Sequence, residues 1–537
     1  MAAMEATGKA QKRLKSKMLK KQQEQAHHDA MAGILNKVFG RVSHSRYIIH
    51  CGATNSGKTY NALMALKQKE TGVYLAPLRL LAWEIYDKLI ADGHSCDLIT
   101  GEEQIVGPQG SRFTSSTIEM LDCNKAYDIA VIDEAFMVGD RERGKAWTKA
   151  ILDVKAEEVH IIVNPEALQV VQGLLTLTGR KYEVKKYEML SKFRFAEHPV
   201  FFTKSIDKGG VFITFSRVNV LIAKMQFREL GLNAGVLYGN LPPEVKRTQI
   251  QGFINGEFDV MVCTDVIGMG LNLPCNYLVF LDIEKYDGVA SRQLSPTEVR
   301  QIAGRTGRYG LSADDCFVSA NGDYKLRRVR ELYAIPDNVH KAYVGFDFEM
   351  FSSFPVGMSI NDRVSAFQNI QFIPEKLRSM VFRESVARYF EIASLVDKKA
   401  FTLDVKWILL TAPIKNNNKT YFSSIVAEYA RDGIMRIPKT GQLYDIKEYE
   451  DKISEIELYL NLSRSLNHQT NEKVYIREQK ELLVNRLSEM LLDKKLAAGK
   501  KCKLCSTMLE LTYPYPYCGT CYNERVRRRW DDDDFHY

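Results

Sequence analysis

The sequence has no apolar run that approaches the roughly 20 residues needed to span a bilayer. It also has no apolar secretory segment near its start, where residues 1–33 carry few apolar side chains. A mitochondrial presequence is rich in arginine and poor in acids, whereas these residues include one arginine and three acidic residues. We therefore expect no membrane span, and this N-terminus favours a cytosolic location in a bacterium or a virus-infected cell.

A disulfide framework is absent as well. Six of the ten cysteines are scattered, several of them inside apolar stretches, and the pattern is typical of buried free thiols in a reducing compartment. These six are Cys51, Cys96, Cys123, Cys263, Cys275 and Cys316.

A strong excess of one charge is also missing. The chain has 74 Lys and Arg against 66 Asp and Glu, a net charge of +8, which permits a polyanionic partner without proving one. Most of the early charge is a lysine-rich run within an N-terminal extension, 1–45. Such a run suits an arm that follows a phosphate backbone. It also suits a solvated, partly helical leader, which is the interpretation we favour.

The stretch that organises the chain is a short apolar strand, 47–51, that leads into a G-x-x-x-x-G-K-T loop and a helix. Glycines let successive backbone N–H groups face phosphate oxygens, and the helix N-terminus adds partial positive charge. In such a loop the lysine reaches the β- and γ-phosphates, and the threonine hydroxyl binds Mg²⁺. The sequence therefore predicts an ATP site made by Gly52, Ala53, Thr54, Asn55, Ser56, Gly57, Lys58 and Thr59.

The next segments alternate apolar strands (73–76, 129–132 and 160–163) with helical patterns. This alternation predicts a parallel, doubly wound sheet with its ligands at the carboxyl ends of the strands. Asp133 and Glu134 follow one such strand directly. There, Asp133 would hold Mg²⁺ through its waters and Glu134 would orient and deprotonate the attacking water.

A second alternating block follows residue 190 and has no phosphate loop of its own. Its strands are expected at 211–215, 234–238, 260–263 and 277–281. Pro296 begins a predicted helix that contains Gln301, Arg305 and Arg308. Because residues three apart lie on one helix face, Arg305 and Arg308 would meet a γ-phosphate together, as arginine fingers.

The chain resembles a superfamily-two helicase core in the motifs it contains and in their order. These are the phosphate loop, Asp-Glu, Thr-Asp with Gly-Met-Gly, and Gln-Ile-Ala-Gly-Arg-Thr-Gly-Arg. Within that superfamily, the chain most closely resembles the mitochondrial degradosome ATP-dependent RNA helicases, the Suv group. The segments that carry this resemblance are 52–60, 76–84, 96–103, 285–288, 406–414 and 457–463. The resemblance covers about residues 46–490. It implies ATP-driven movement along RNA, and along DNA or hybrids as alternatives, in the 3′ to 5′ direction, and it implies a mitochondrial location.

Residue roles follow from the resemblance by position. It implies that Gln301, Arg305 and Arg308 sense the γ-phosphate and that Gly270 belongs to the nucleotide site. It also implies that six further residues lie in segments that line the nucleic-acid channel or couple it to ATP. These are Arg79, Thr117, Ser216, Arg217, Thr264 and Asp265.

Two positions depart from the family pattern. Phe136 stands where such helicases carry His or Gln, and Asn164-Pro165-Glu166 replaces a Gly-Glu-Pro segment. Both positions transmit nucleotide state between domains in the family. The departures leave ATP binding intact but put the coupling of hydrolysis to unwinding in question.

The pattern turns helical and amphipathic over 336–490, for example at 375–382. Beyond it, Cys502, Cys505, Cys518 and Cys521 form two C-x-x-C pairs with twelve residues between them, the spacing of a four-thiolate Zn²⁺ site. Arginines at 525 and 527–529 with Trp530 offer phosphate contacts and a stacking ring for nucleic acid. The four aspartates at 531–534 would repel nucleic acid, so a protein partner such as a nuclease is an open alternative.

We therefore expect an α/β protein with two tandem recombinase-like domains, 46–190 and 191–335, a helical region, 336–490, a zinc module, 500–529, and an acidic tail, 530–537. The expected function is that of an ATP-dependent RNA helicase that requires Mg²⁺. Two alternatives remain: a translocase that remodels nucleic acid without separating strands, and an ATP-switched adaptor that recruits a nuclease.

Overall fold

The computed structural model describes two compact units, each assembled from separate stretches of the chain. The first comprises 1–189, 338–436 and 458–469, and the second comprises 190–337, 437–457 and 470–537. Within them, the described residues are 18, 44–101, 103–107, 110–190, 193–201, 206–268, 273, 275–286, 290–307, 315–355, 357–369, 379–397, 399–468, 473–492, 499–501 and 508–510.

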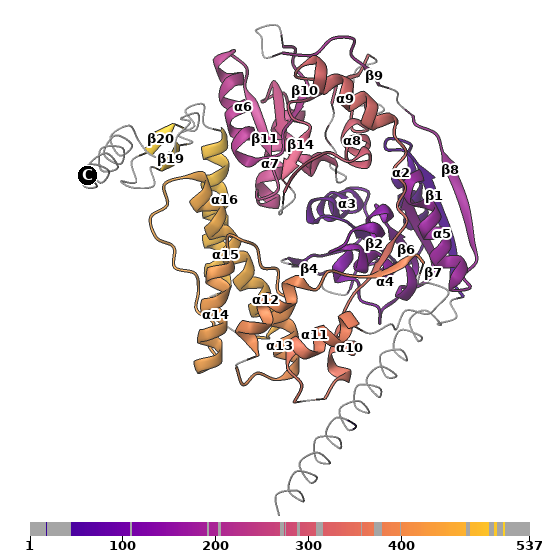
Figure 1. Cartoon of the computed structure of the whole chain (residues 1–537), viewed down its shortest axis with the longest axis vertical. Helices are drawn as coiled ribbons and strands as arrows, with labels where there is room; N and C mark the ends of the chain where they lie inside the picture. The colour runs from indigo at the N-terminus through magenta and orange to yellow at the C-terminus, as the bar shows by residue number, and fades with distance from the viewer. Residues whose placement is uncertain are drawn as a thin grey trace, which may run out of the picture. The chain divides into compact units, whose positions relative to one another are not determined.

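The first unit is built on an eight-stranded sheet in the order β4-β3-β5-β2-β6-β7-β1-β8, with β8 at the edge beside β1 (Figure 1). Its pairs are parallel except for β3 with β4. The central strands are buried along almost their whole length, which explains their nearly continuous apolar sequences. The strands are β1 (Arg46–Gly52), β2 (Gly72–Ala76), β3 (Cys96–Ile99), β4 (Gln104–Ile105), β5 (Phe113–Thr117), β6 (Ala126–Ile132), β7 (Lys155–Val163) and β8 (Tyr182–Tyr187).

Helices join these strands and cover the sheet. Apolar residues of α2 and α3, such as Leu66 and Leu81, pack against Tyr74 and Val131 of the central strands. The elements are α2 (Lys58–Lys67), α3 (Arg79–Ala91), α4 (Gly144–Asp153) and α5 (Leu168–Leu177), with short 3-10 turns η1 (Ile118–Met120), η2 (Ala135–Gly139) and η3 (Pro165–Ala167).

The second unit contains a six-stranded sheet, all parallel, in the order β11-β12-β10-β13-β16-β9. Its strands are β9 (Arg194–Phe195), β10 (Gly210–Ile213), β11 (Ala234–Leu237), β12 (Val260–Cys263), β13 (Tyr277–Phe280) and β16 (Phe317–Ala320), and a hairpin joins β14 (Glu284–Tyr286) to β15 (Ser291–Gln293). The helices are α6 (Arg217–Glu229), α7 (Pro243–Ile254), α8 (Pro296–Ala303) and α9 (Asp323–Ala334), with η4 (Asp265–Gly268). The prediction of two parallel-sheet domains is confirmed.

The remaining described elements are mostly helical, as predicted. They are α10 (Phe348–Ser353), α11 (Ile360–Asn369), α12 (Ala387–Val396), α13 (Leu403–Leu410), α14 (Lys419–Asp432), α15 (Ile446–Ser465) and α16 (Lys473–Leu492), with β17 (Ala342–Val344), β18 (Val381–Arg383), β19 (Gly499–Lys501) and β20 (Met508–Glu510). The prediction of a helix over 375–382 is wrong at its C-terminal end, because 381–383 form a strand that pairs with β17. Residues 375–378 lie outside the described part.

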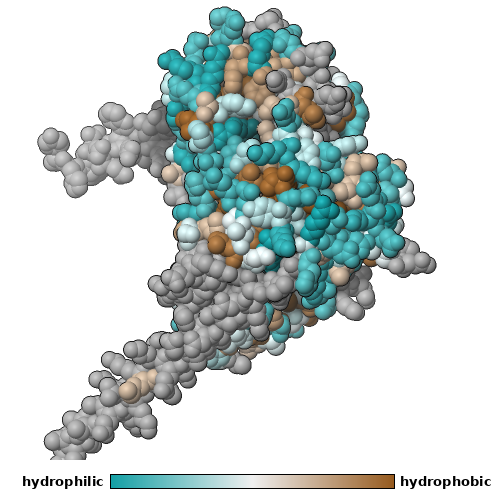
Figure 2. All heavy atoms as spheres, turned by 90° about the vertical axis from the view of Figure 1, so that its right-hand side faces the viewer, coloured by the Kyte–Doolittle hydropathy of each residue, from teal (hydrophilic) through white to brown (hydrophobic). Residues whose placement is uncertain are grey.

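In the view of Figure 2 the described surface is largely hydrophilic, with hydrophobic residues in small separate groups, as is usual for a folded protein surface. Within the described ranges, no helix has the length and apolar character needed to cross a membrane. Five of the six scattered cysteines are buried free thiols, as predicted, whereas Cys123 is half-buried.

Candidate nucleotide and nucleic-acid site

The phosphate loop joins the carboxyl end of β1 to the first turn of α2. Asn55 and Gly57 have positive φ values of 59° and 78°, and the helix begins at Lys58. A Cβ atom at Gly52 would lie 2.6 Å from the Tyr187 carbonyl oxygen and 2.8 Å from Ser56 Oγ, so only glycine fits there. The loop has the backbone form of a phosphate cradle.

Lys58 folds back over the loop that precedes it. Its Nζ atom donates to the carbonyl oxygens of Gly52 at 2.7 Å and Ala53 at 2.6 Å, and lies 3.4 Å from Ser56 Oγ. Thr59 follows as the second residue of α2 and is half-buried. The ammonium group and the hydroxyl thus lie at the same helix start as the loop's N–H groups, where an anion is favoured.

Asp133 comes directly after β6, two strands from β1 on the same sheet edge. Its carboxylate is 3% exposed, and it is held on both oxygens: Oδ2 accepts from the Tyr74 hydroxyl, and Oδ1 accepts from the Glu134 N–H at 2.8 Å. Trp147 Nε1 also donates to the Asp133 carbonyl oxygen at 2.8 Å. Burial and the neighbouring Glu134 carboxylate raise the pKa of Asp133 to about 7, although Lys58 and the hydrogen bonds act in the opposite direction.

Glu134 occupies the left-handed region, at φ 49° and ψ 46°, which few residues other than glycine adopt. Such a conformation persists only where the surrounding structure enforces it, and it is concentrated at functional sites. Asp133 and Thr59 both offer hard oxygen ligands, which Mg²⁺ prefers, and the start of the loop at Gly52 has no room for a side chain. The residues present therefore fit ATP with Mg²⁺.

In the second unit, two of the predicted nucleotide-sensing residues, Gln301 and Arg305, lie at the end of α8 and just beyond it. Gln301 lies on the helix, and its Nε2 is a buried donor without an acceptor among the described residues. A guanidinium nitrogen of Arg305 donates to the Gly268 carbonyl oxygen at 2.8 Å. The prediction that Arg305 lies on the same helix face as Arg308 is wrong, because α8 ends at Ala303 and Arg305 lies in the turn beyond. Arg308 and Gly270 lie outside the described residues.

The residues predicted to meet nucleic acid in the second unit have local partners. Ser216 caps α6 by accepting from the Asn219 N–H at 3.0 Å. Arg217 forms an ion pair with Glu450 of α15, at 3.0 Å, and the Tyr238 hydroxyl donates to the same carboxylate at 2.5 Å. Of the other two, Thr264 is buried just after β12, and Asp265 pairs with Lys285 at 2.9 Å.

Arg79 and Thr117 lie at the carboxyl ends of the paired strands β2 and β5, Arg79 as the first residue of α3. Arg143, which the sequence did not predict as a site residue, joins these two segments. Its guanidinium donates to the Pro77 carbonyl oxygen at 2.6 Å and to Glu119 at 2.7 Å. In the sequence, Arg143 is one charge in a polar turn, so only the fold reveals this role.

The two positions that depart from the family pattern lie on the same sheet edge. Phe136 is half-buried within η2, immediately after Glu134 and Ala135. Asn164 caps η3, accepting from the Ala167 N–H at 3.2 Å, and Pro165 takes the first position of that turn. Glu166 presents its carbonyl oxygen to the Val339 N–H at 2.8 Å.

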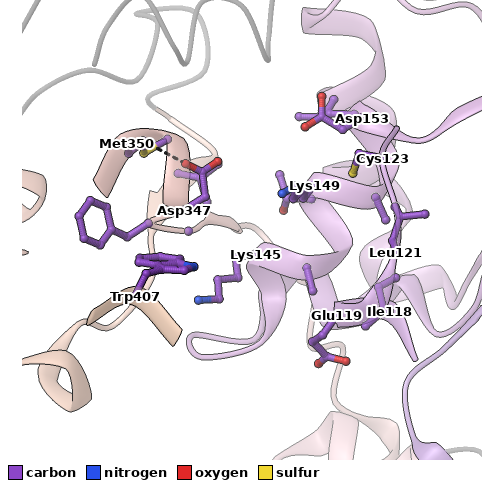
Figure 3. A pocket seen from close by; sticks show the side chains of 17 residues that line it. Ile118, Glu119, Leu121, Cys123, Lys145, Lys149, Asp153, Asp347, Met350 and Trp407 are labelled. Carbon is purple, nitrogen blue, oxygen red and sulfur yellow. Dashed lines mark hydrogen bonds between the residues drawn. The ribbon is translucent and has the colours of Figure 1, made fainter. Parts of the chain in front are cut away.

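A separate pocket of about 260 Å³ lies in the first unit, and no candidate site residue lines it. Figure 3 shows Leu121, Cys123, Lys149 and Asp153 on one side of it, facing Asp347, Met350 and Trp407. Its lining is largely apolar.

The four cysteines of the predicted zinc module, Cys502, Cys505, Cys518 and Cys521, lie outside the described residues, as do Arg525 to Asp534. Among the residues that the structure describes, no group of three or more His, Cys, Asp or Glu side chains could hold a metal ion.

Two sheets of almost entirely parallel strands, the first of which carries the phosphate loop, together with a helical C-terminal region, define an ATPase of the helicase class with two RecA-like domains. Two family descriptions match the chain: "DEXQ-box helicase domain of Suv3" at residues 38–187 and "Helicase conserved C-terminal domain" at 185–310. At residues 133–136 the chain reads Asp-Glu-Ala-Phe, so it has phenylalanine at the position where the DEXQ box has glutamine.

Curated relatives extend the similarity along the chain. "DExH-box ATP-dependent RNA helicase DExH16, mitochondrial" of Arabidopsis thaliana is 33% identical, covering 83% of this chain and 81% of the relative. "ATP-dependent RNA helicase SUV3, mitochondrial" of Oryza sativa subsp. japonica is 32% identical, covering 86% and 78%. Human "ATP-dependent RNA helicase SUPV3L1, mitochondrial" is 32% identical, covering 74% of this chain and 52% of the relative, which is thus much longer.

The chain therefore belongs to the Suv3 family of ATP-dependent RNA helicases. The resemblance stated from the motifs is confirmed, and with it the expected class of enzyme. Among solved structures, the chain is similar to Dbp5 of S. cerevisiae bound to RNA and ADP BeF3, with a TM-score of 0.45 and 13% identity over 68% of this chain and 92% of that one.

Proposed function

We propose that this chain hydrolyses ATP to move along RNA in the 3′ to 5′ direction and to separate paired strands. The observation that carries the proposal is the joint placement of the phosphate loop and Asp133-Glu134 at one edge of a single parallel sheet. Ligands of such sheets bind at this edge. Membership of the Suv3 family supports RNA as the substrate, with DNA and RNA–DNA hybrids as alternatives.

In this proposal each residue of the first unit acts on a defined atom. The loop N–H groups and Lys58 bind the β- and γ-phosphates, and Thr59 and Asp133 hold Mg²⁺, which neutralises charge on the phosphate oxygens. Glu134 orients the attacking water and accepts its proton. Gln301, Arg305 and Arg308 contribute from the second domain by sensing the γ-phosphate.

The nucleic-acid path is proposed along the segments that contain Arg79, Thr117, Ser216, Arg217, Thr264 and Asp265. The positions of Arg79 and Thr117 at neighbouring strand ends support this for the first domain. Because Arg217 is paired with Glu450, we assign it to holding its segment in place rather than to neutralising phosphate directly.

We propose domain limits of 46–190, 191–335 and 336–490 after an N-terminal extension, 1–45. A four-cysteine zinc module at 500–529 and an acidic tail at 530–537 complete the proposal. The two C-x-x-C pairs support one Zn²⁺ per chain, because thiolates bind this ion tetrahedrally. We assign the module to capture of a nuclease or another protein. Metal analysis of the purified chain tests it: about one zinc is expected, and none after replacing Cys502 and Cys505 with serine.

For location, we propose the mitochondrial matrix. The support is that relatives are named mitochondrial. The cytosolic expectation drawn from residues 1–33 has no support from these relatives. Fractionation of the source cell, with the chain detected by antibody, tests the proposal, and its recovery outside mitochondria would contradict it.

A second candidate function is an ATP-driven translocase that does not separate strands, and Phe136 favours it. A phenyl ring cannot make the hydrogen bond that the family's glutamine amide offers at this position. The adaptor alternative requires that nucleic acid leave the rate of ATP turnover unchanged.

The experiment that tests the proposal is ATP turnover measured with and without single-stranded RNA, with Lys58→Ala as control. We expect RNA to raise turnover severalfold and the variant to abolish it. Turnover that RNA leaves unchanged would overturn the proposal in favour of the adaptor.

A further inference from the structure

Tyr74 is the third residue of β2 and lies beside the strand that carries the predicted magnesium carboxylate. In the parallel pair of β2 with β6, Tyr74 is in register with Val131. Side chains alternate along a strand, so Val131 and Asp133 share one face, and Tyr74 lies on that same face. The ladder continues to Asp133, whose N–H donates to the Leu75 carbonyl oxygen at 3.0 Å. A phenol at residue 74 can therefore reach the carboxylate diagonally.

The contact is made in a fully enclosed position. Tyr74 is 0% exposed and Asp133 is 3% exposed, and the Tyr74 hydroxyl donates to Asp133 Oδ2. The other oxygen, Oδ1, accepts from the Glu134 N–H at 2.8 Å. Each oxygen of an ionised carboxylate offers two lone pairs, so one on each oxygen is engaged by the protein. The carboxylate plane is thereby fixed, and the remaining lone pairs have fixed directions.

We propose that Tyr74 is a positioning residue for Mg²⁺, holding the Asp133 carboxylate in the orientation in which its free lone pairs accept from the ion's water ligands. The inference rests on the proposed role of Asp133 and extends it to a residue outside the helicase motifs. A buried tyrosine hydroxyl needs some hydrogen-bond partner in any case. What distinguishes the proposal is that the partner chosen is the metal carboxylate, so loss of the hydroxyl must change the response to Mg²⁺.

The test uses Tyr74→Phe in the full chain, which removes one oxygen and keeps the ring. Equilibrium binding of a fluorescent ADP is titrated with Mg²⁺ and repeated in EDTA. Loss of a group that orients a metal ligand typically weakens metal binding 10- to 100-fold. We expect the Mg²⁺ concentration for half-maximal enhancement of ADP binding to rise about tenfold, while binding in EDTA stays unchanged.

Tyr47→Phe is the matched control. Tyr47 is 1% exposed on β1 of the same sheet, and its hydroxyl donates to the Ile151 carbonyl oxygen at 3.3 Å and accepts from Arg180 at 3.1 Å, away from Asp133. It should leave the Mg²⁺ midpoint unchanged. An equal shift in both variants, or none in a folded Tyr74→Phe chain, overturns the inference.

A double-mutant comparison separates an effect on Mg²⁺ from a general loss of stability in Tyr74→Phe, because a general loss would add to the effect of Asp133→Asn. If Tyr74 acts through Asp133, then Tyr74→Phe adds nothing to the Mg²⁺ response of Asp133→Asn, whereas independent effects add. Additive effects in this comparison would overturn the inference. Failure of the proposed function is distinct, because it is measured by RNA-stimulated ATP turnover and strand release, whereas this test measures only how ADP binding depends on Mg²⁺.

Discussion

At the scale of single residues, the candidate site depends on two backbone conditions at neighbouring strand ends. Gly52 ends β1 so close to the Tyr187 carbonyl oxygen that no side chain fits. Glu134 is held in the left-handed region directly after Asp133. The carboxylate proposed to be catalytic is thus presented by a strained turn, and the loop proposed to bind the nucleotide begins at a position restricted to glycine.

Gly52→Ala should damage the site without removing any functional group. The added methyl would overlap Tyr187 and Ser56, and overpacking of this kind typically costs about 1–3 kcal/mol. If that strain is released by distorting the loop, ATP affinity should fall about tenfold or more, since 1.4 kcal/mol is tenfold. ATP affinity by fluorescence titration checks this. Gly441→Ala, where an added Cβ meets nothing within 4 Å, should behave like the unmodified chain.

At the scale of elements, α4 connects Asp133, the carboxylate proposed to hold Mg²⁺, to the loops proposed for nucleic acid. Trp147 on this helix donates to the Asp133 carbonyl oxygen, and Arg143, just before it, binds Pro77 and Glu119. The Arg143 guanidinium also lies 5.3 Å from the Trp147 ring. All of these contacts lie within the first unit, so the helix fixes three strand ends together.

Arg143→Gln should weaken RNA binding, because the segments of Arg79 and Thr117 lose their common anchor. Arg143 and Glu119 are 33% and 43% exposed, so we expect a loss of only about 1 kcal/mol, roughly fivefold in Kd. RNA affinity by anisotropy checks this. Arg46→Gln, which removes an exposed ion pair at the amino end of β1, should leave the affinity unchanged, and an equal loss there would contradict the role of Arg143.

The helix α8 supplies a prediction of pH dependence. Burial disfavours ionisation of Glu298, but hydrogen bonds from Arg292, Lys285 and the Ser295 N–H outweigh it and lower its pKa to about 2 from 4.5. A depressed pKa stabilises the fold above pH 4.5, and that contribution is lost as pH falls toward 2. The shift corresponds to about 3 kcal/mol, as an order of magnitude.

Glu298→Gln should therefore lower the free energy of unfolding most at pH 7, and the difference from the unmodified chain should shrink below pH 4.5. Denaturant titrations at pH 7 and at about pH 3 measure it. Glu331→Gln, which breaks an exposed pair with Arg328, serves as control and should have little effect at either pH. A difference that grows as pH falls would contradict the assignment.

At the scale of the whole molecule, much of the architecture could be predicted because buried parallel strands are continuously apolar. The strands that end at Gly52, Ala76, Ile132 and Cys263 are all expected from that pattern. The strand β5 was not, because its sequence Phe-Thr-Ser-Ser-Thr is polar although every residue is buried. Two of its hydroxyls donate to backbone carbonyl oxygens, Ser115 to Ala82 at 2.6 Å and Ser116 to Thr117 at 3.0 Å.

The candidate site also contains some residues that the sequence predicts and others that only the fold reveals. Lys58, Asp133 and Glu134 could be predicted because local spacing determines their positions. Tyr74 and Arg143 could not, because their contacts depend on the register between β2 and β6 and on the return of α4 to the sheet edge. The end of α8 before Arg305 was also missed, since the glycine at 304 is compatible with either a helix or its end.

Strand displacement tests the central claim most directly. RNA duplexes with a 3′ or a 5′ single-stranded tail are incubated with the chain and ATP, and release of the labelled strand is followed. The account predicts ATP-dependent release from the 3′-tailed duplex, little from the 5′-tailed one, and none with Lys58→Ala. RNA-stimulated ATP turnover without release from either duplex would contradict helicase action and leave translocation without unwinding.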